Sequence, residues 1–343
     1  MNQINLNNKE YDVIIVGAGF SGLYQLICLR DQLGMNCLVV ETGDDVGGTW
    51  YWNRYPGARC DTESHAYSYY FSDELLKEWT WSERYPGHAE IRRYMNFVAD
   101  KFDLKKDILF NHKVTSAQYN EDKICWEITT NNKINFRSKF LITAVGCLSN
   151  ANIPKIKGLE NFKGKYYHTG NWPKNGVSFV GKKVGQIGTG STGIQAVPVI
   201  AEEAKHLTVF QRTANYSVPA RNKPLTENFK SHVKEKFKYY RELLKKTPNG
   251  HPFEISDRLV ADVQEQEMQE IYEKAWEKGG LQFRGSFSDL VTNVEANKTA
   301  SDFIKNKINE TVLNKKFAAI LSDIDHPYAG KRPPIDTNYF ETY

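Results

Sequence analysis

Two segments of the chain share one pattern, in which a short apolar run leads through three spaced glycines into a stretch of helical character. The first segment has apolar residues at 11–16, the sequence Gly17-x-Gly19-x-x-Gly22, and a second apolar run at 36–40. The second segment repeats this order with apolar residues at 183–187, Gly188-x-Gly190-x-x-Gly193, and a run at 207–210. Short β-branched runs bounded by glycine predict strands, and the residues after each glycine turn, 23–30 and 194–204, predict helices.

The remaining segments have patterns of their own. Glycine and aromatic residues crowd residues 43–70, and a loop of this length in a compact domain is usually functional. Residues 90–102 predict an amphipathic helix, residues 109–142 alternate as in a small antiparallel sheet, and residues 147–181 predict a linker.

Apolar residues recur at helical spacing over 223–322, and examples are Phe229, Val233, Phe237, Tyr240, Met268, Ile271, Tyr272 and Trp276. This segment predicts a helical insertion, and its apolar positions are better explained as a packing face than as a substrate-side lid. We therefore predict an α/β fold with two Rossmann-like dinucleotide-binding domains. The first domain covers residues 1–146, the second covers 147–222 with 323–343, and residues 223–322 form a helical insertion in the second.

Each glycine motif has the sequence context of a dinucleotide fingerprint. The first glycine permits a tight turn, the second permits close approach of a pyrophosphate, and the third permits the helix to pack on the strand. The N–H groups at the start of the helix are then available to phosphate oxygens. A chance glycine pattern is the alternative, but two copies with the same strands and spacing argue against it.

The residue that follows each unit indicates which nucleotide is bound. Glu41 lies 19 residues after Gly22, where a carboxylate can accept hydrogen bonds from ribose hydroxyls and would repel a 2′-phosphate. Arg212 lies 19 residues after Gly193, and a guanidinium there can hold a phosphate in bidentate fashion. We expect FAD or NAD at the first site and NADPH at the second. The alternative for Arg212 is an ordinary surface arginine.

Composition excludes several other classes of protein. The chain has 343 residues, 25% of them charged, and its net charge of +4 is too small and too dispersed to indicate nucleic-acid binding. We find no apolar run long enough to cross a membrane and no apolar segment of a signal peptide near the N-terminus. The five cysteines lack metal-ligand spacing with the histidines, so we expect free thiols in a reducing cytoplasm and no metal site.

A further motif carries a family resemblance. The sequence Phe162-x-Gly164-x-x-x-His168-x-x-x-Trp172-Pro173, just before the second fingerprint, resembles the signature of flavin-dependent Baeyer–Villiger monooxygenases. Residues 47–67 and 331–343 are also similar to the phenylacetone and cyclohexanone monooxygenase group. The Trp-Pro ending distinguishes the motif from that of the related flavin monooxygenases of amines and sulfides.

The resemblance implies an enzyme in which NADPH reduces FAD, O2 adds to the flavin C4a, and the resulting peroxide inserts one oxygen atom next to a ketone carbonyl. The product is an ester or lactone. A fixed cation suits the negative charge that develops in such a site, because arginine remains charged even when it is buried. By position in the motifs, Arg332 resembles the catalytic arginine of the family, and Asp61 resembles the acid that pairs with it.

The resemblance and the two fingerprints together also imply the cofactor-binding residues. For FAD these are Gly17, Gly19, Phe20, Ser21, Gly22, Glu41, Thr49, Trp50, Tyr51, Trp52, Asp61, Tyr67 and Val114. For NADPH they are Arg59, Cys60, Gly188, Thr189, Gly190, Ser191, Thr192, Gly193, Gln195, Arg212, Thr213, Lys331 and Arg332. Lys331 and Arg212 resemble a clamp for the 2′-phosphate, whereas His168 and Trp172 suit a structural role in linking the domains.

The chain departs from the family pattern in one respect. It stops before the segment that returns to the FAD domain, so we expect a fragment of a longer enzyme whose first domain lacks its C-terminal part. We expect this fragment, expressed alone, to bind FAD weakly or not at all. Two other functions stay open: a flavin monooxygenase of sulfides or amines, and a non-catalytic nucleotide-binding remnant.

Overall fold

The structure, a computed structural model, describes residues 7–343 and divides them into two compact units. The first unit extends to Arg54 and includes His88–Gly176, and the second comprises Tyr55–Gly87 and Val177–Tyr343. The sequence-based boundaries placed residues 55–87 in the first domain and 147–176 in the second. The structure instead places residues 55–87 in the second unit and residues 147–176 in the first, because each segment makes most of its contacts there.

The first unit is built on a six-stranded sheet with the strand order β3-β2-β1-β6-β5-β4. Its strands are β1 (Lys9–Val16), β2 (Cys37–Val40), β3 (Ile108–Leu109), β4 (Val114–Asn120), β5 (Cys125–Thr130) and β6 (Asn135–Thr143). β1 pairs in parallel with β2 and β6, whereas β4, β5 and β6 pair in antiparallel fashion. The antiparallel strands predicted over 109–142 are therefore part of the dinucleotide-binding sheet, because β6 pairs with β1 as well as with β5.

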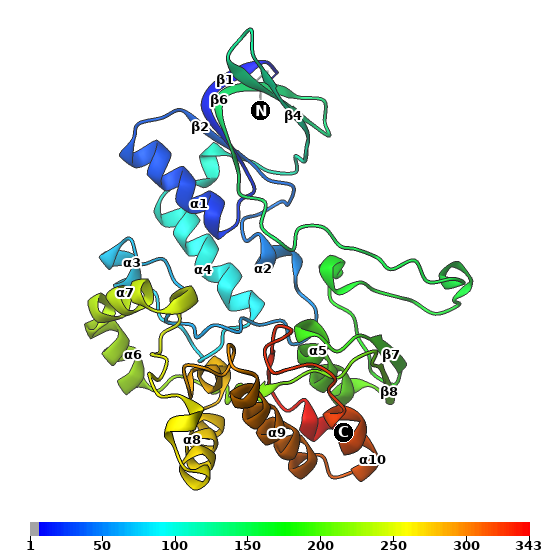
Figure 1. The fold of residues 1–343 in the computed structure, drawn as a ribbon. Helices are drawn as coiled ribbons and strands as arrows, with labels where there is room; N and C mark the ends of the chain where they lie inside the picture. Colours follow the sequence, from blue (N-terminus) through cyan, green and yellow to red (C-terminus); the bar gives the residue numbers. More distant parts are fainter. Residues whose placement is uncertain (1–6) are drawn as a thin grey trace. The chain divides into compact units, whose positions relative to one another are not determined.

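Two helices, α1 (Phe20–Leu26) and α4 (His88–Lys101), lie side by side in this unit (Figure 1). Helix α1 continues as a π-helical turn over Ile27–Gln32. The rings of Phe20 and Tyr94 meet at 6.2 Å between their centroids. The buried positions of α4 follow helical spacing, and they are Glu90, Ile91, Tyr94, Met95, Val98 and Ala99. Helix α2 (Thr49–Trp52) and short 3₁₀ turns at 105–107, 159–161 and 169–171 complete the unit.

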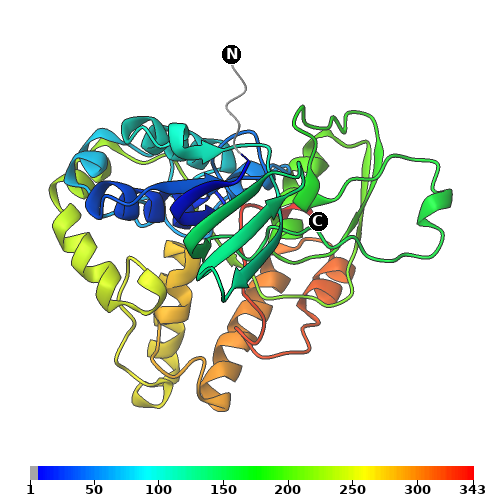
Figure 2. The same ribbon diagram turned by 90° about the horizontal axis from the view of Figure 1, so that it is seen from above.

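The second unit contains the other predicted strand–helix–strand segment. β7 (Lys183–Ile187) and β8 (His206–Phe210) pair in parallel, and α5 (Ser191–Glu203) connects them, as predicted (Figure 1; Figure 2 gives the view from above). A second parallel pair is formed by β9 (Val218–Pro219) and β10 (Ile335–Asp336). Helix α3 (Asp73–Glu78) follows the loop that begins at Tyr55.

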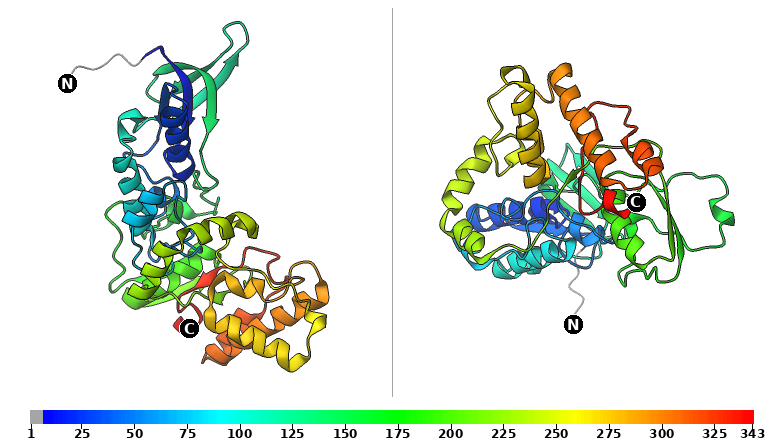
Figure 3. Two further views of the ribbon diagram at one scale, coloured as in Figure 1. Left: turned by 90° about the vertical axis from the view of Figure 1, so that its left-hand side faces the viewer. Right: turned by 90° about the horizontal axis from the view of Figure 1, so that it is seen from below.

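The predicted helical insertion is a run of helices in the second unit (Figure 3). Its helices are α6 (Glu227–Glu235), α7 (Phe237–Lys246), α8 (Glu265–Lys278), α9 (Val294–Thr311) and α10 (Lys315–Ser322). Helices α8 to α10 share one core with α5, centred on the rings of Tyr272, Phe283 and Phe303. The apolar positions that the sequence pattern marked on α8 thus form a packing face, since Met268, Tyr272 and Trp276 are all buried.

The third glycine of the second fingerprint is required by packing. A Cβ atom at Gly193 would lie 2.3 Å from the carbonyl oxygen of Gly188, whereas a Cβ at Gly190 meets no heavy atom within 4 Å. We predict that Gly193→Ala lowers the free energy of unfolding by about 1–3 kcal/mol through overpacking. Gly190→Ala is the matched control, and as a helix N-cap change it costs less than about 1 kcal/mol. Urea denaturation of the two variants measures the difference, and equal stability would contradict the proposed packing.

Candidate functional site

The first fingerprint forms a tight turn between β1 and α1. Gly17 has a φ of +104°, and a Cβ there would lie 2.7 Å from the carbonyl oxygen of Ala144, just after β6. A Cβ at Gly22 would lie 1.9 Å from the oxygen of Gly17, so only glycine allows the helix to begin against the turn. Gly19 is the N-cap residue of α1, so no side chain caps the N–H groups that follow it in the first turn, which includes Ser21. The turn therefore has the geometry of a phosphate cradle.

Glu41 is a buried carboxylate beside this turn, with 5% of its surface exposed. Its Oε2 accepts a hydrogen bond from the Ala18 N–H at 2.7 Å, and its Oε1 accepts one from the Gly43 N–H at 2.7 Å. Each carboxylate oxygen keeps a second lone pair. Glu41 thus fixes the loop after β2 against the glycine turn and keeps capacity to bind hydroxyl groups.

The aromatic residues of α2 belong to the same unit. Trp50 and Tyr51 are buried, and the Tyr51 hydroxyl donates to Asp44 at 2.6 Å. The guanidinium of Arg92, on α4, lies 5.2 Å from the centre of the Tyr51 ring. Thr49 and Trp52 are half-buried at the ends of α2, and Val114 begins β4 beside a bulge. Eleven of the FAD-site candidates thus lie in the first unit, whereas Asp61 and Tyr67 lie in the second.

The second fingerprint repeats this geometry in the second unit. Gly188 has a φ of +101°, and the Gln186 side-chain amide donates to the carbonyl oxygens of Gly188 and Gly193 at 3.3 and 3.1 Å. The Thr189 hydroxyl donates to the Thr213 carbonyl at 3.3 Å and so joins the turn to the end of β8. The N-cap of α5 is Gly190, and the side chains of Ser191 and Thr192 follow in its first turn. The open space at Gly190 leaves room for a bound group to approach the backbone.

Three cationic side chains among the predicted NADPH-site residues face solvent. Arg212 follows β8, and Lys331 and Arg332 precede β10; all three are exposed. The Arg332 side chain is 73% exposed, yet its guanidinium holds a buried partner. Among the described residues, Arg212 and Lys331 form no ion pair with an acidic side chain, so both charges are available to an anion.

Asp61 is that buried partner. It is 7% exposed, and its Oδ2 accepts a hydrogen bond from Arg332 at 2.8 Å while its Oδ1 accepts one from the Gln195 amide at 3.2 Å. Burial raises the pKa of Asp61, and the charge of Arg332 and the two hydrogen bonds act in the opposite direction. The structure thus brings together Asp61, Arg332 and Gln195, which are far apart in the sequence.

The other candidates in the loop after Tyr55 are buried or half-buried. Arg59 donates to the carbonyl of Tyr85 at 2.9 Å and forms an ion pair with Glu83 at 3.3 Å. Cys60 is buried, and burial raises the pKa of its thiol to about 12. Tyr67 is half-buried and its N–H donates to the Glu63 carbonyl at 3.1 Å. Arg59 and Cys60 therefore support the loop through internal contacts.

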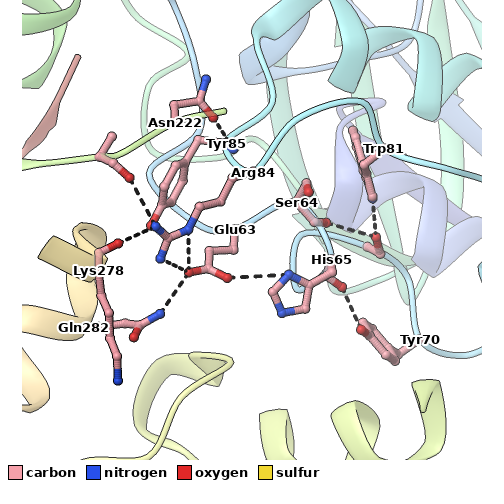
Figure 4. Close-up of polar contacts among 12 residues, drawn as sticks. Glu63, Ser64, His65, Tyr70, Trp81, Arg84, Tyr85, Asn222, Lys278 and Gln282 are labelled. Carbon is pink, nitrogen blue, oxygen red and sulfur yellow. Dashed lines mark hydrogen bonds and ion pairs between the residues drawn. The ribbon is translucent and has the colours of Figure 1, made fainter. Parts of the chain in front are cut away.

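A polar cluster anchors the same loop two residues beyond Asp61 (Figure 4). Glu63 binds the Arg84 guanidinium through both Nε and Nη2, at 3.1 and 2.7 Å, and accepts a further bond from Gln282 at 3.2 Å. Arg84 also donates to the Lys278 carbonyl at the end of α8, at 2.5 Å. This cluster ties the Asp61 loop to the helical region. Sequence reasoning missed it, because no spacing connects positions so far apart.

His65 belongs to this cluster and is buried. Its Nδ1 lies 3.6 Å from Glu63, and its ring packs edge-on against Phe229 and Tyr240 of α6 and α7. Burial lowers the pKa of His65, so the imidazole is neutral at pH 7 and acts as a packing group. His168 of the signature motif is also structural here, since its Nδ1 accepts a hydrogen bond from the Gly170 N–H at 3.1 Å and so caps a 3₁₀ turn.

Known proteins that are similar to the chain point to one family. The flavin-binding monooxygenase-like family matches residues 10–247. The chain is 42% identical to a 2-oxo-Δ3-4,5,5-trimethylcyclopentenylacetyl-CoA monooxygenase of Pseudomonas putida and 44% identical to a cyclohexanone 1,2-monooxygenase of an Acinetobacter species, and each match covers 97% of the chain. It covers 62% and 61% of those two proteins, or about three fifths of their length.

Solved structures agree with these relatives. An oxidised steroid monooxygenase bound to NADP matches with a TM-score of 0.94 and 45% identity, over 98% of this chain and 64% of that one. The chain belongs to the flavin-binding monooxygenase-like family. Within that family its relatives include proteins named as cyclohexanone and Baeyer–Villiger monooxygenases, which confirms the resemblance carried by the 162–173 motif.

Two kinds of feature are absent from the described part of the chain. None of the helices within residues 7–343 has both the length and the apolar character needed to cross a membrane. The same residues include no group of three histidine, cysteine or acidic side chains placed to hold a metal ion.

A second buried carboxylate lies close to Arg332 in sequence. Asp336, on β10, is 4% exposed, and the hydroxyl of Ser217, just before β9, donates to its Oδ2 at 2.6 Å. Burial raises the pKa of Asp336 to about 6 from an ordinary value of 3.8. The protonated form is thus the one that the fold favours.

Because the pKa of Asp336 is higher in the folded state, its contribution to stability is complete below pH 3.8 and is lost as the pH rises through about 6. The amide side chain of the variant Asp336→Asn cannot titrate. We predict that the stability of the variant relative to the parent rises by on the order of 3 kcal/mol between pH 3.8 and 7. Urea denaturation over this range measures the difference, and a difference independent of pH would contradict the buried titration.

Proposed function

We propose that the protein to which this chain belongs is an FAD- and NADPH-dependent Baeyer–Villiger monooxygenase. It converts a ketone, O2, NADPH and a proton into an ester or lactone, NADP+ and water. The observation that carries the proposal is the ion pair between the exposed Arg332 guanidinium and the buried Asp61 carboxylate. This pair lies in a chain that has two dinucleotide fingerprints. When bound, FAD would take electrons from NADPH and deliver one oxygen atom of O2 to the substrate.

The residues of each unit fit one of the two cofactors. We assign the Gly17–Gly22 turn to the pyrophosphate of FAD and Glu41 to its ribose, because the turn is closed only by glycine and the carboxylate excludes a 2′-phosphate. We assign the Gly188–Gly193 turn to NADPH, with Arg212 and Lys331 as the cations for its 2′-phosphate. The other predicted contacts, Thr49 to Trp52, Tyr67, Val114, Thr189 to Thr192 and Thr213, stay proposals on the same basis.

Arg332 and Asp61 have distinct roles in this proposal. Arg332 places a permanent positive charge where negative charge develops on oxygen during insertion, and fixed charges of this kind lower the barrier without reorganisation. Asp61 orients the guanidinium and balances its charge at rest. The substrate is a small ketone, and the five free cysteines agree with a cytoplasmic location.

Replacement of Arg332 separates its role from cofactor binding. We predict that Arg332→Ala, made in the protein to which this chain belongs, lowers ester formation by at least about a hundredfold, the size of effect seen when one stabilising donor is removed. NADPH consumption continues in this variant and yields hydrogen peroxide in place of ester. Assays of ester, NADPH and peroxide with a panel of ketones measure the outcome.

Arg258→Ala is the matched control, since the Arg258 side chain forms an exposed ion pair with Glu267 on α8. Normal ester formation by Arg332→Ala would reject the proposed role. Sulfoxide or N-oxide as the sole product of the parent protein would favour the alternative class of flavin monooxygenase.

Arg212 gives the test of nucleotide choice. We predict that Arg212→Ala weakens NADPH binding at least about fivefold and leaves NADH binding unchanged, because the lost charge-assisted bonds are those to the 2′-phosphate. Titration of each nucleotide measures the two affinities. Lys183→Ala, at the exposed start of β7, is the control for a general loss of positive charge. Equal losses for both nucleotides would remove Arg212 from the phosphate site.

A further inference from the structure

The side-chain amide of Gln195 is fully occupied by the protein itself. Gln195 lies in the first turns of α5 and is 8% exposed. Its Nε2 donates to Asp61 Oδ1 at 3.2 Å and to the Arg59 carbonyl at 3.1 Å, and its Oε1 accepts from the Tyr55 hydroxyl at 2.8 Å and from the Arg59 N–H at 3.4 Å. An amide group has two donors and two lone pairs. All four are used, so the side chain has no capacity left for a nucleotide.

The backbone of Arg59 fixes which way the amide points. The Arg59 N–H donates to Gln195 Oε1, and the Arg59 C=O accepts from Gln195 Nε2. These two hydrogen bonds can form together in only one orientation of the amide. The opposite orientation would place Oε1 against the Arg59 carbonyl and the Asp61 carboxylate, where every contact is repulsive. Gln195 therefore presents a donor to Asp61 and not an acceptor.

The two oxygens of Asp61 have different partners. Oδ2 receives the Arg332 guanidinium, whose side chain is 73% exposed, and Oδ1 receives the buried Gln195 amide. A long exposed side chain has many rotamers and cannot by itself fix the plane of a carboxylate. The buried partner, held at four points, is the one that can do so.

We propose that Gln195 is a positioning residue that orients Asp61 and, through Asp61, sets the place of the Arg332 guanidinium. The inference rests on the proposed function only in assigning Arg332 a catalytic role. The contacts link α5, whose first turn contains the last glycine of the second fingerprint, to Arg332 through one buried carboxylate. Tyr55, which is buried and donates to the same amide, is the next member of the chain of contacts.

The substitution Gln195→Met tests the proposal because it keeps the length of the side chain and removes its hydrogen bonds. We expect ester formation to fall about tenfold, as for the loss of one hydrogen bond to a charged group, while NADP+ affinity stays within about twofold. We also expect the pKa of Asp61 to rise, since one of the groups that lower it is lost. Gln266→Met is the matched control, because the Gln266 amide contacts only Glu270 on the surface of α8.

A readout independent of activity keeps the inference separate from the proposed function. The Asp61 carboxyl is followed by ¹³C NMR of protein labelled at aspartate, and Asp61→Asn assigns its signal. A higher titration midpoint in Gln195→Met supports the inference even where the parent protein forms no ester. Where Gln195→Met does not fold, Gln195→Asn, which is one methylene shorter, replaces it. An unchanged Asp61 titration together with a tenfold weaker NADP+ affinity would overturn the proposal and return Gln195 to the nucleotide site.

Discussion

The buried Asp61 carboxylate is the group on which the polar contacts of the second unit depend. A charged group taken out of water requires partners, and the loss of one leaves an uncompensated charge. Arg332 and Gln195 supply these partners, one on each oxygen, and the two residues are far apart in the sequence. One carboxylate therefore fixes the loop after Tyr55, the helix of the second fingerprint and the segment before β10 with respect to one another.

The rest of the loop is arranged to hold Asp61 in place. Two residues further on, Glu63 and Arg84 form a paired contact that reaches the end of α8, and Gln282 adds a third partner. On the other side the backbone of Arg59 holds the Gln195 amide. Each of these groups is polar and largely shielded from water, so their hydrogen bonds are worth more than surface contacts and are costly to leave unmade. The helical region thus contributes to the site by fixing the loop.

The sequence predicted the parts of this structure that depend on local rules. Strand β7 has its predicted bounds, and α5 and β8 lie within a few residues of theirs, because glycine spacing and apolar runs act over short distances. The family motifs predicted that Asp61 pairs with Arg332, and the structure shows this contact. The Gln195 amide network, the Glu63–Arg84 pair and the Ser217–Asp336 pair could not be predicted, because each joins residues more than 20 positions apart with no repeating pattern. The placement of β6 beside β1 depended in the same way on long-range pairing.

The central claim is that Asp61 and Arg332 act as one unit, and a double-mutant cycle tests it directly. Urea denaturation of the parent, Asp61→Asn, Arg332→Met and the double variant gives four free energies of unfolding. The account predicts a coupling of at least about 1 kcal/mol between the two positions, because Arg332→Met leaves the buried Asp61 carboxylate without its cationic partner. Additive effects within about 0.5 kcal/mol would show that the two side chains do not interact and would contradict the account.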